Sequence, residues 1–345
     1  MSRRPRVHAV VPTIGASPHL ARCLDALLAQ QGVELSVVLV EQRRASAAIP
    51  AAVRRLATRG CGFAAAANAG LATAADTPLV ALVNDDAVVG AGWLEALCTA
   101  LLDDPTLGSV QGTNLLGFGP DAPSRSRTLD GVGIAFNRWW QAVQIGHRAQ
   151  ARRLLASVVP GGASEGPREV LGVSATAAIY RREPLERRAE EPGPPTAFDE
   201  RLESYYEDVD LACRLRAAGL RAAWVPGVTV EHAGSASAGA TTGAPRRRLV
   251  VRNRLLVLAR LLGRRLPAAL PRILVRDVVD GWRGGARGLA SAAAAWGGAL
   301  RRLAGFAHAG PPRVPLATLR ALSAERATAE LLGIGGRPGE SGGAR

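Results

Sequence analysis

The first half of the chain alternates short apolar runs with segments of helical periodicity. Mainly apolar runs, each short enough for one buried strand, occupy residues 7–11, 35–40 and 79–83. Apolar residues recur at helical spacing over 20–28 and 93–102, and a short helix is predicted over 51–57. Strands that alternate with helices indicate a mostly parallel sheet with both faces buried. The pattern therefore predicts an α/β fold.

Polar residues follow each of the three strand-like runs. Pro12-Thr13 follows the first, Glu41-Gln42 the second, and Asn84-Asp85-Asp86 the third. Ligands of parallel sheets bind beyond the carboxyl ends of the strands. These positions are therefore the first candidates for a binding site.

The rest of the chain is less regular. Residues 117–167 are rich in Gly, Pro and Ser and are predicted to form an irregular excursion, and residues 183–197 a polar loop. From residue 249, apolar stretches alternate with arginines, which predicts short amphipathic helices separated by prolines and glycines. We divide the chain into a main domain over 1–245, a basic helical region over 246–332 and a disordered tail over 333–345.

Composition narrows the class of protein. The chain has 345 residues, 48% of them hydrophobic, and its 43 basic residues are all arginine. Cys23, Cys61, Cys98 and Cys213 lie far apart without a CxxC pair, which favours reduced thiols over disulfides or a metal site. The amino-terminal apolar run is too short for a signal peptide, and no uncharged run is long enough to span a bilayer. We expect a cytoplasmic protein.

The Asn84-Asp85-Asp86 segment allows two interpretations. Adjacent carboxylates repel each other unless a cation or hydrogen-bond donors neutralise them. The segment could be a solvated turn after a strand. It could also be a hard-cation site in which a carboxylate binds Mg²⁺ or Mn²⁺ and the ion holds a diphosphate, since such sites need only one or two protein oxygens.

Further acidic residues precede a helical pattern in YYEDVDLACRLRAAGL. Glu207, Asp208 and Asp210 lie at its start and Gly219 is a plausible stop. Carboxylates in a first helical turn are stabilised by the helix dipole, so a structural interpretation is open for each. His232 follows a strand-like run, where a lone histidine is more often structural than a ligand.

The segment 60–65 matches GxGxxG/A. No strand directly precedes it, so we favour close helix packing of small residues over dinucleotide binding.

Six segments in this order resemble the family 2 glycosyltransferases of the GT-A fold, especially the bacterial branch of rhamnosyl- and galactofuranosyl-type transferases. They are VVPTIGASPHLARCLDALLAQ, GFAAAANAGLATA, LVALVNDDAVV, VSATAAIYRREPL, FDERLESYYEDVDLACRLRAAG and VPGVTVEHAGSAS. The resemblance covers roughly residues 7–262. It implies a GT-A fold with a mostly parallel sheet flanked by helices and a Rossmann-like nucleotide-binding half, followed by a basic helical appendage.

The resemblance implies roles for the acidic and histidine motifs. Asp86 would bind the metal, Mg²⁺ or Mn²⁺, and His232 would complete the metal or diphosphate site. Asp208 would be the catalytic base that takes the proton of the acceptor hydroxyl, and Glu207 would orient the acceptor or the base. Asp210 keeps its ordinary role at the helix start.

The other matches fall in the nucleotide-sugar subsite. They are Pro12, Thr13, Glu41, Asn68, Asn84 and Asp85. Here the chain departs from the family. Thr-Ile-Gly stands where Thr-Tyr-Asn is usual after the first strand, and Glu-Gln-Arg-Arg stands where Asp-Asn-Gly-Ser is usual after the second. The identity of the nucleotide is therefore not predicted.

We expect an inverting, metal-dependent glycosyltransferase of the hexosyltransferase type. It would move a sugar from a nucleotide-diphosphate sugar to a hydroxyl of a cell-surface glycan or lipid-linked acceptor. One base and one metal, without a second carboxylate as nucleophile, indicate direct displacement with inversion. A non-catalytic sugar-nucleotide-binding or scaffold homologue is the alternative, and an NAD(P)-dependent oxidoreductase is a weaker one based on residues 60–65.

Basic charge is concentrated in the last third of the chain. The net charge is +14, and fifteen arginines but only two aspartates lie between Arg246 and Arg313. The arginines could cover ordinary packing helices, or they could attach the protein peripherally to an anionic membrane at its inner face, where lipid-linked acceptors are found. Nucleic-acid binding is disfavoured because no nucleic-acid motif accompanies the charge.

Overall fold

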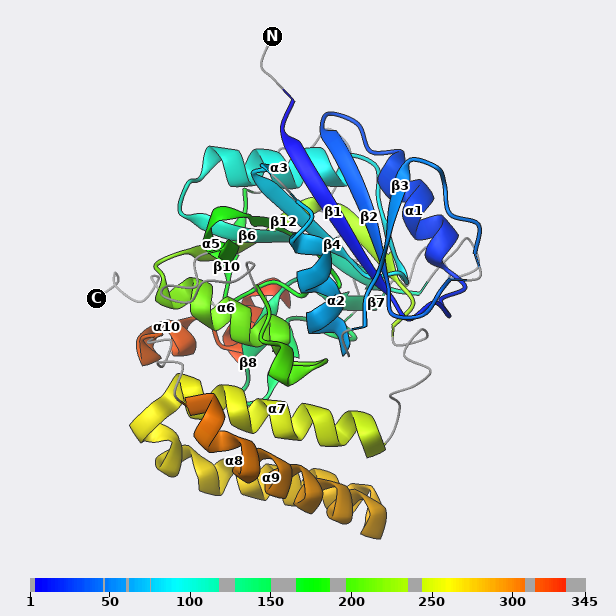
Figure 1. Cartoon of the computed structure of the whole chain (residues 1–345). Helices are drawn as coiled ribbons and strands as arrows, with labels where there is room; N and C mark the ends of the chain where they lie inside the picture. The colour runs from blue at the N-terminus through cyan, green and yellow to red at the C-terminus, as the bar shows by residue number, and fades with distance from the viewer. Residues whose placement is uncertain are drawn as a thin grey trace, which may run out of the picture.

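A large mixed sheet with helices on both faces forms the body of the protein, and a layer of long helices lies beside it (Figure 1). The computed structural model describes residues 4–45, 47–59, 62–74, 76–117, 128–149, 166–186, 197–234, 244–307 and 314–332. The expected tail over 333–345 and most of the polar loop over 183–197 lie outside these residues.

The first part of the chain contains β1 (Arg6–Thr13), α1 (Leu20–Leu28), β2 (Glu34–Glu41), β3 (Val53–Ala57), α2 (Gly62–Leu71), β4 (Leu79–Val83), β5 (Ala87–Val89), α3 (Trp93–Asp103) and β6 (Leu107–Leu116). The middle contains β7 (Thr128–Gly131), β8 (Ile134–Phe136), β9 (Ala142–Gln144), β10 (Arg168–Val170), β11 (Ala177–Arg181), α5 (Glu183–Glu186), η1 (Glu200–Leu202), α6 (Glu207–Ala217) and β12 (Arg221–His232). The last part contains α7 (Ala244–Leu262), η2 (Gly263–Arg265), α8 (Leu266–Arg283), α9 (Gly285–Ala307), α10 (Leu316–Ala321) and α11 (Ala324–Leu332).

The sheet combines a parallel half with an antiparallel insertion. In the described residues its order is β10-β12-β6-β11-β4-β1-β2-β3. Strands β3, β2, β1 and β4 run parallel, as the alternation of strands and helices predicts. Strand β11 lies antiparallel between β4 and β6, and β5 and β7 are short antiparallel partners of β12 and β6. Because β1, β2 and β4 are parallel, their carboxyl ends lie on one edge of the sheet.

The helix predicted over 51–57 is wrong. Residues Val53–Ala57 form β3, which pairs in parallel with β2 at the edge of the sheet. A helix of this length is marginal in water, whereas pairing with β2 supplies backbone hydrogen-bond partners. Arg54 and Arg55 are exposed there, and charged side chains are common on edge strands.

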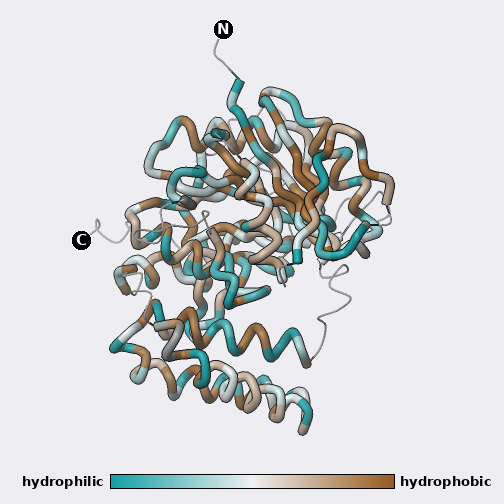
Figure 2. The backbone as a smooth tube through the Cα atoms, in the orientation of Figure 1, coloured by the Kyte–Doolittle hydropathy of each residue, from teal (hydrophilic) through white to brown (hydrophobic). Residues whose placement is uncertain are grey.

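Each face of the sheet has its own apolar core. Helices α1 and α3 cover one face with Leu24, Leu97 and neighbours, while α2, α6 and α7 cover the other. Figure 2 shows the hydrophobic residues concentrated along the central strands. The predictions of helices over 20–28 and 93–102 are confirmed. The described part of the 117–167 excursion is more regular than expected, because it contains strands β7, β8 and β9.

Helices α7, α8 and α9 form the layer beside the sheet, at the bottom of Figure 1. They have 19, 18 and 23 residues, so the prediction of short helices is wrong. Pro271 lies inside α8 instead of ending a helix. Proline removes one backbone hydrogen bond, and packing of α8 against α9 holds the helix together across it. No helix in the described part of the chain is both long and apolar enough to cross a membrane.

Candidate active site

The acidic segment after β4 is tied to the end of β1. Because β1 and β4 are neighbouring parallel strands, their carboxyl ends meet at one edge. Thr13 Oγ1 donates a hydrogen bond to Asp85 Oδ2 at 2.5 Å, and Ser17 Oγ donates to the Asp85 carbonyl oxygen at 2.9 Å. Burial raises the pKa of Asp85 to about 6, although the Thr13 hydroxyl opposes the rise. Thr13 and Asp85, predicted from separate motifs, therefore form one buried unit.

His232 bridges two carboxylates. Strand β12 is antiparallel to β5, and this register puts His232 opposite Ala87, next to Asp86. The ring Nε2 lies 3.3 Å from Asp86 Oδ1, and Nδ1 lies 2.8 Å from Asp130 Oδ2. Burial alone would lower the pKa of His232, but the hydrogen bonds to Asp130 and Asp86 outweigh it and raise the pKa to about 9. The two flanking carboxylates therefore favour the protonated form of the His232 ring.

The Asp86–His232 pair has the chemistry and spacing of two metal ligands. Ligands about 2.0–2.2 Å from one ion and at right angles lie about 3 Å apart, which matches their 3.3 Å separation. A metal-bound histidine usually donates its other ring N–H to a carboxylate, as His232 does toward Asp130. No preformed group of three His, Cys, Asp or Glu ligands occurs in the described residues. A divalent ion here would take its other ligands from phosphate and water.

Glu207 and Asp208 begin α6 in different environments. Asp208 accepts hydrogen bonds from the backbone N–H of Val209 at 2.8 Å and of Ala175 at 3.4 Å. The Oε2 atom of Glu207 is buried and has no hydrogen-bond partner in the described structure. Burial raises the pKa of both groups, and the nearby Asp208 charge raises the pKa of Glu207 further. The negative charge of the pair therefore belongs on Asp208, where backbone N–H groups stabilise it.

A single dipeptide connects the acidic strand end with Asp208. The backbone N–H of Asn84 donates to the Thr176 carbonyl oxygen at 2.8 Å. The preceding residue, Ala175, donates its N–H to Asp208 Oδ2. The segment that leads into β11 therefore brings together motifs 124 positions apart in the chain, Asn84 and Asp208.

The turn before α6 has a strained backbone. Glu203, Tyr205 and Tyr206 have positive φ angles of 63°, 69° and 70°. Such conformations are costly for non-glycine residues and persist only when surrounding contacts hold them. Because Tyr206 is the residue directly before Glu207, this turn sets the direction in which the two carboxylates leave the helix start.

Helices α2 and α7 hold this strained turn from two sides. From α7, the fully buried Asn253 lies with Nδ2 within 2.6–3.0 Å of the carbonyl oxygens of Leu202, Ser204 and Tyr205. From α2, the backbone N–H of Ala64 donates to the Glu203 carbonyl oxygen at 2.9 Å. The position of Glu207 and Asp208 thus depends on Asn253, more than forty residues downstream.

Replacing Asn253 with alanine should destabilise the protein. The variant leaves buried carbonyl oxygens without their donor, which costs about 1–3 kcal/mol. Urea unfolding of Asn253→Ala should show a free energy of unfolding lower by this amount. Arg248→Ala, an exposed change on the same helix, is the control and should stay within about 0.5 kcal/mol of wild type. Equal stability of the two variants would contradict the assigned role of Asn253.

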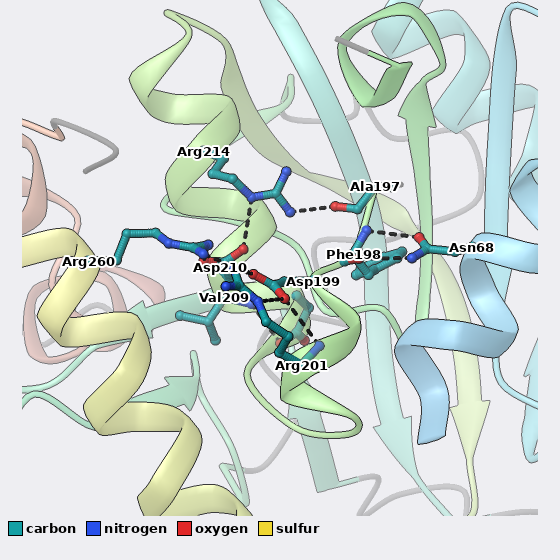
Figure 3. Close-up of polar contacts among 10 residues, drawn as sticks. Asn68, Ala197, Phe198, Asp199, Arg201, Val209, Asp210, Arg214 and Arg260 are labelled. Atoms are coloured by element: carbon teal, nitrogen blue, oxygen red, sulfur yellow. Dashed lines mark hydrogen bonds and ion pairs between the residues drawn. The ribbon is translucent and has the colours of Figure 1, made fainter. Parts of the chain in front are cut away.

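An ion-pair network joins α7 to α6 behind the site (Figure 3). Arg260 binds Asp210 Oδ1 at 2.6 Å and Asp199 Oδ2 at 2.9 Å, and all three side chains are buried. Arg214 and Arg201 complete the neutralisation of the two aspartates. Asp210 therefore does more than start a helix, which is the role the sequence indicated. Part of the basic charge of α7 faces inward and does not contribute to the surface.

Two predicted nucleotide-site residues have their polar groups engaged by the protein. Glu41 neighbours Thr13 in the sheet register, but its carboxylate forms a bidentate pair with Arg55 at 2.7 and 2.8 Å. The hydrogen bonds from Arg55 lower the pKa of Glu41. The Asn68 amide exchanges hydrogen bonds of 2.9 Å with the Phe198 backbone (Figure 3). The structure therefore does not bring the Asn68 side chain to the strand-end site. Pro12 is buried at the end of β1.

The glycine-rich start of α2 packs against protein. A Cβ on Gly62 would lie 2.5 Å from the Glu203 carbonyl oxygen, so only glycine fits there. The amides of Gly62, Phe63 and Ala64 donate to Gln42, Ser204 and Glu203. The premise that no strand precedes residues 60–65 is wrong, because β3 ends at Ala57. The packing interpretation rests instead on these amide groups, which a dinucleotide phosphate would need and which the protein itself already binds. Gly60 and Cys61 lie outside the described residues.

Sequence reasoning missed three residues that shape the site: Asp130, Asn253 and Arg260. Asp130 lies within the segment predicted to be irregular, and Asn253 and Arg260 lie in the basic helix. The dipeptides Asp130-Gly131 and Arg252-Asn253 match no motif that would mark these residues as part of a site.

The sequence matches a known protein family, and the structure is similar to solved structures. The family model described as Glycosyltransferase like family 2 matches residues 5–250. The structure of GalNAc-T7 with UDP, GalNAc and Mn²⁺ is similar at a TM-score of 0.53 and 13% identity, over 75% of this chain and 48% of that one. This chain thus spans about half the length of that protein. S. aureus TarS 1–349 in complex with UDP-GlcNAc is similar at a TM-score of 0.51 and 14% identity, over 94% of this chain and 88% of that one.

No curated protein matches the sequence. At these identities, similarity to the solved structures concerns the fold alone. It confirms the predicted α/β architecture, a large central sheet flanked by helices as in GT-A glycosyltransferases.

Proposed function

The chain belongs to the glycosyltransferase-like family 2, and from this premise we propose that it is an inverting, metal-dependent glycosyltransferase. It moves a sugar from a nucleotide-diphosphate donor to an acceptor hydroxyl. The observation that carries the proposal is the Ala175-Thr176 segment, which links the acidic strand end at Asn84 to the carboxylate of Asp208. A donor-side acidic site and a candidate base are thus neighbours in one edge of the fold.

On the donor side, Asp86 and His232 would hold Mg²⁺ or Mn²⁺. When bound, the ion supplies positive charge that neutralises the departing diphosphate. Asp130 keeps the His232 ring oriented through its Nδ1 atom, 2.8 Å away. Thr13 fixes the Asp85 carboxylate beside this site. Pro12, Thr13, Asn84 and Asp85 stay our proposed contacts for the nucleotide and the diphosphate.

On the acceptor side, Asp208 would be the base. As the acceptor oxygen attacks the anomeric carbon, Asp208 takes its proton, a contribution of about 10²–10⁴-fold to the rate. Burial raises the pKa of Asp208 above that of an ordinary aspartate, which makes its carboxylate a stronger base for this task. Glu207 is held in its neutral acid form by burial and by the Asp208 charge, and a neutral acid can donate a hydrogen bond to the acceptor. With one base and no nucleophilic carboxylate, displacement inverts the anomeric centre.

For the acceptor we propose a cell-surface glycan or a lipid-linked precursor, as in cell wall or polysaccharide synthesis, with a hexose or related sugar transferred. The rhamnosyl- and galactofuranosyl-type branch remains the proposed subgroup. The place of action proposed is the cytoplasm, peripherally at the inner face of the cell membrane. Incubation with UDP, dTDP and GDP sugars and Mn²⁺ should release nucleoside diphosphate. NMR of the product should show an inverted anomer, and a retained anomer would contradict the mechanism.

A non-catalytic, sugar-nucleotide-binding homologue is the second candidate. The ion pair between Glu41 and Arg55 favours this candidate, because it engages the carboxylate that was predicted to contact the nucleotide. Binding of a nucleoside diphosphate without turnover of any sugar donor would establish this alternative.

Replacing Asp130 with asparagine should weaken metal activation. The amide lacks the charge that orients His232 and increases its basicity, and loss of such a partner costs about 10–100-fold in metal affinity or activity. The Mn²⁺ concentration for half-maximal transfer should rise accordingly. Isothermal titration of Mn²⁺ in the presence of UDP should show the same weakening. Asp103→Asn, an exposed change on α3, should leave both values unchanged. An unaltered Mn²⁺ requirement in Asp130→Asn would remove His232 from the proposed metal site.

A further inference from the structure

Helix α8 presents large apolar side chains that the described part of the chain leaves uncovered. Leu274, Val275, Val278, Val279 and Trp282 form what we term the α8 apolar face, and they are 48%, 55%, 49%, 38% and 73% exposed. At about 3.6 residues per turn they share one side of the helix. Contiguous exposed apolar patches mark interaction sites, whereas single exposed residues need no explanation. The α8 apolar face therefore requires a partner.

The opposite side of α8 is anchored, so the helix cannot turn this face inward. Its buried residues are Ala269, Ile273, Asp277 and Gly281. Asp277 forms an ion pair with Arg254 at 2.5 Å and accepts a hydrogen bond from the Trp296 indole N–H at 2.9 Å. Rotation of α8 would break this buried ion pair, which is strongly unfavourable. The face is thus held outward by the helices behind it.

Arginines border the α8 apolar face. Arg272, Arg276 and Arg283 fall on an adjoining side of the same helix, and Arg264, Arg265 and Arg287 are exposed at its two ends. Asp280 is the one acidic residue of α8 that is not fully buried, and Arg276 binds it at 2.8 Å. The border of the face is therefore positively charged. Figure 1 shows α8 in the helical layer beside the sheet, on the side of the molecule away from β1 and β2.

We propose that the α8 apolar face docks on an anionic lipid bilayer. A helix with an apolar side and an arginine border lies in the plane of the interface, with its apolar residues among the acyl chains and its arginines at the anionic headgroups. Trp282, the most exposed of the five, has the amphipathic ring that favours this boundary. A second copy of the chain is a poorer fit, because a symmetric contact sets the same arginines against each other, and Asp280 of α8 is already paired with Arg276. The biological purpose of this docking rests on the proposed function, because docking would place the active site beside lipid-linked acceptors.

Vesicle binding by the full chain tests the proposal without a sugar donor. In co-sedimentation, vesicles of phosphatidylglycerol and phosphatidylcholine should bind the protein more tightly than pure phosphatidylcholine vesicles do. The double variant Val275→Glu/Val278→Glu removes apolar contact and adds negative charge at the anionic surface, so its partition coefficient should fall about tenfold or more. The matched control is Leu102→Glu on α3, which changes an equally exposed apolar residue, 55%, outside the face and should leave binding unchanged.

The charge and the orientation are tested separately. Arg264→Gln and Arg265→Gln should each weaken binding to anionic vesicles about fivefold, and added salt should weaken the wild type. Vesicles should shift the tryptophan fluorescence of the wild type to shorter wavelength, and Trp282→Phe should lose most of that shift. Circular dichroism melts confirm that the variants are folded.

Equal vesicle binding by wild type and Val275→Glu/Val278→Glu would overturn the proposal. A second result would also overturn it: neither form binds vesicles, the wild type self-associates in sedimentation velocity, and the double variant does not. That result would assign the face to a second copy of the chain. Transfer to a soluble acceptor does not depend on the α8 apolar face. If transfer is retained while vesicle binding is absent, the docking inference alone fails.

Discussion

Replacing Asp208 with asparagine should lower sugar transfer by about 10²–10⁴-fold, the usual contribution of a positioned general base. Asparagine keeps the shape of the side chain and can still accept hydrogen bonds from Val209 and Ala175. It cannot take a proton. Because burial disfavours the charged form of Asp208, the neutral amide should not lower the melting temperature. Affinity for the nucleoside diphosphate, measured by titration calorimetry, should stay near that of wild type.

Glu207→Gln is the matched control for this prediction. Burial and the Asp208 charge raise the pKa of Glu207 well above its ordinary value, which favours the neutral acid. Glutamine imitates the neutral acid that burial favours, and the loss of transfer should be much smaller than for Asp208→Asn. The wild-type rate should also fall on acidification at a higher pH than an ordinary aspartate would cause. A larger loss in Glu207→Gln than in Asp208→Asn would reverse the two assignments.

Replacing Arg260 with methionine should lower the free energy of unfolding by about 3–5 kcal/mol, the usual cost of removing one partner from a buried ion pair. Arg260 is 4% exposed and binds Asp199 and Asp210, which are 2% and 0% exposed. Arg201 and Arg214 continue to pair with these carboxylates, which places the expected loss toward the lower end. Urea unfolding followed by circular dichroism measures the change. The exposed change Arg264→Met should be nearly neutral.

The pH dependence of the Arg260→Met effect provides a second check. Burial alone would raise the pKa of Asp199, but the hydrogen bonds from Arg201 and Arg260 outweigh it, so the pKa lies below its ordinary value. The stabilisation is therefore present above the unfolded-state pKa of about 4 and is lost as the pH falls below it. The stability difference between wild type and Arg260→Met should shrink over that range. A difference that grows on acidification would contradict this account.

The fold was largely predictable because strand and helix patterns are local. The runs over 7–11, 35–40 and 79–83 are all strands, and 20–28 is a helix with these bounds. The error over 51–57 arose from the same local reasoning. Residues 51–57 are compatible with a helix or a strand, and pairing of Val53–Ala57 with β2 makes this segment a strand. The length of α8 was missed because Pro271 reads as a helix end until packing against α9 is known.

The site was predictable only in part. The sequence marked the acidic strand end, the Glu207-Asp208 pair and His232, since these residue types carry chemistry wherever they lie. It could not indicate Asp130, because the bond from His232 to Asp130 joins residues 102 positions apart. Nor could it indicate that the Glu41 carboxylate forms an ion pair with Arg55. The hydrogen bonds of the Asn68 amide to Phe198 and Glu200 were equally unpredictable.

The sequence by itself determined the α/β class, the order of the acidic and histidine motifs and the basic character of the last third. Those properties depend on residue type and spacing along the chain. Only the tertiary structure decided that Asn253 holds the strained turn before α6, and that Arg260 neutralises Asp199 and Asp210. It also decided which arginines are buried in ion pairs and which border the exposed face of α8. Burial and partnership are set by contacts across some fifty residues or more, for which a local pattern carries no signal.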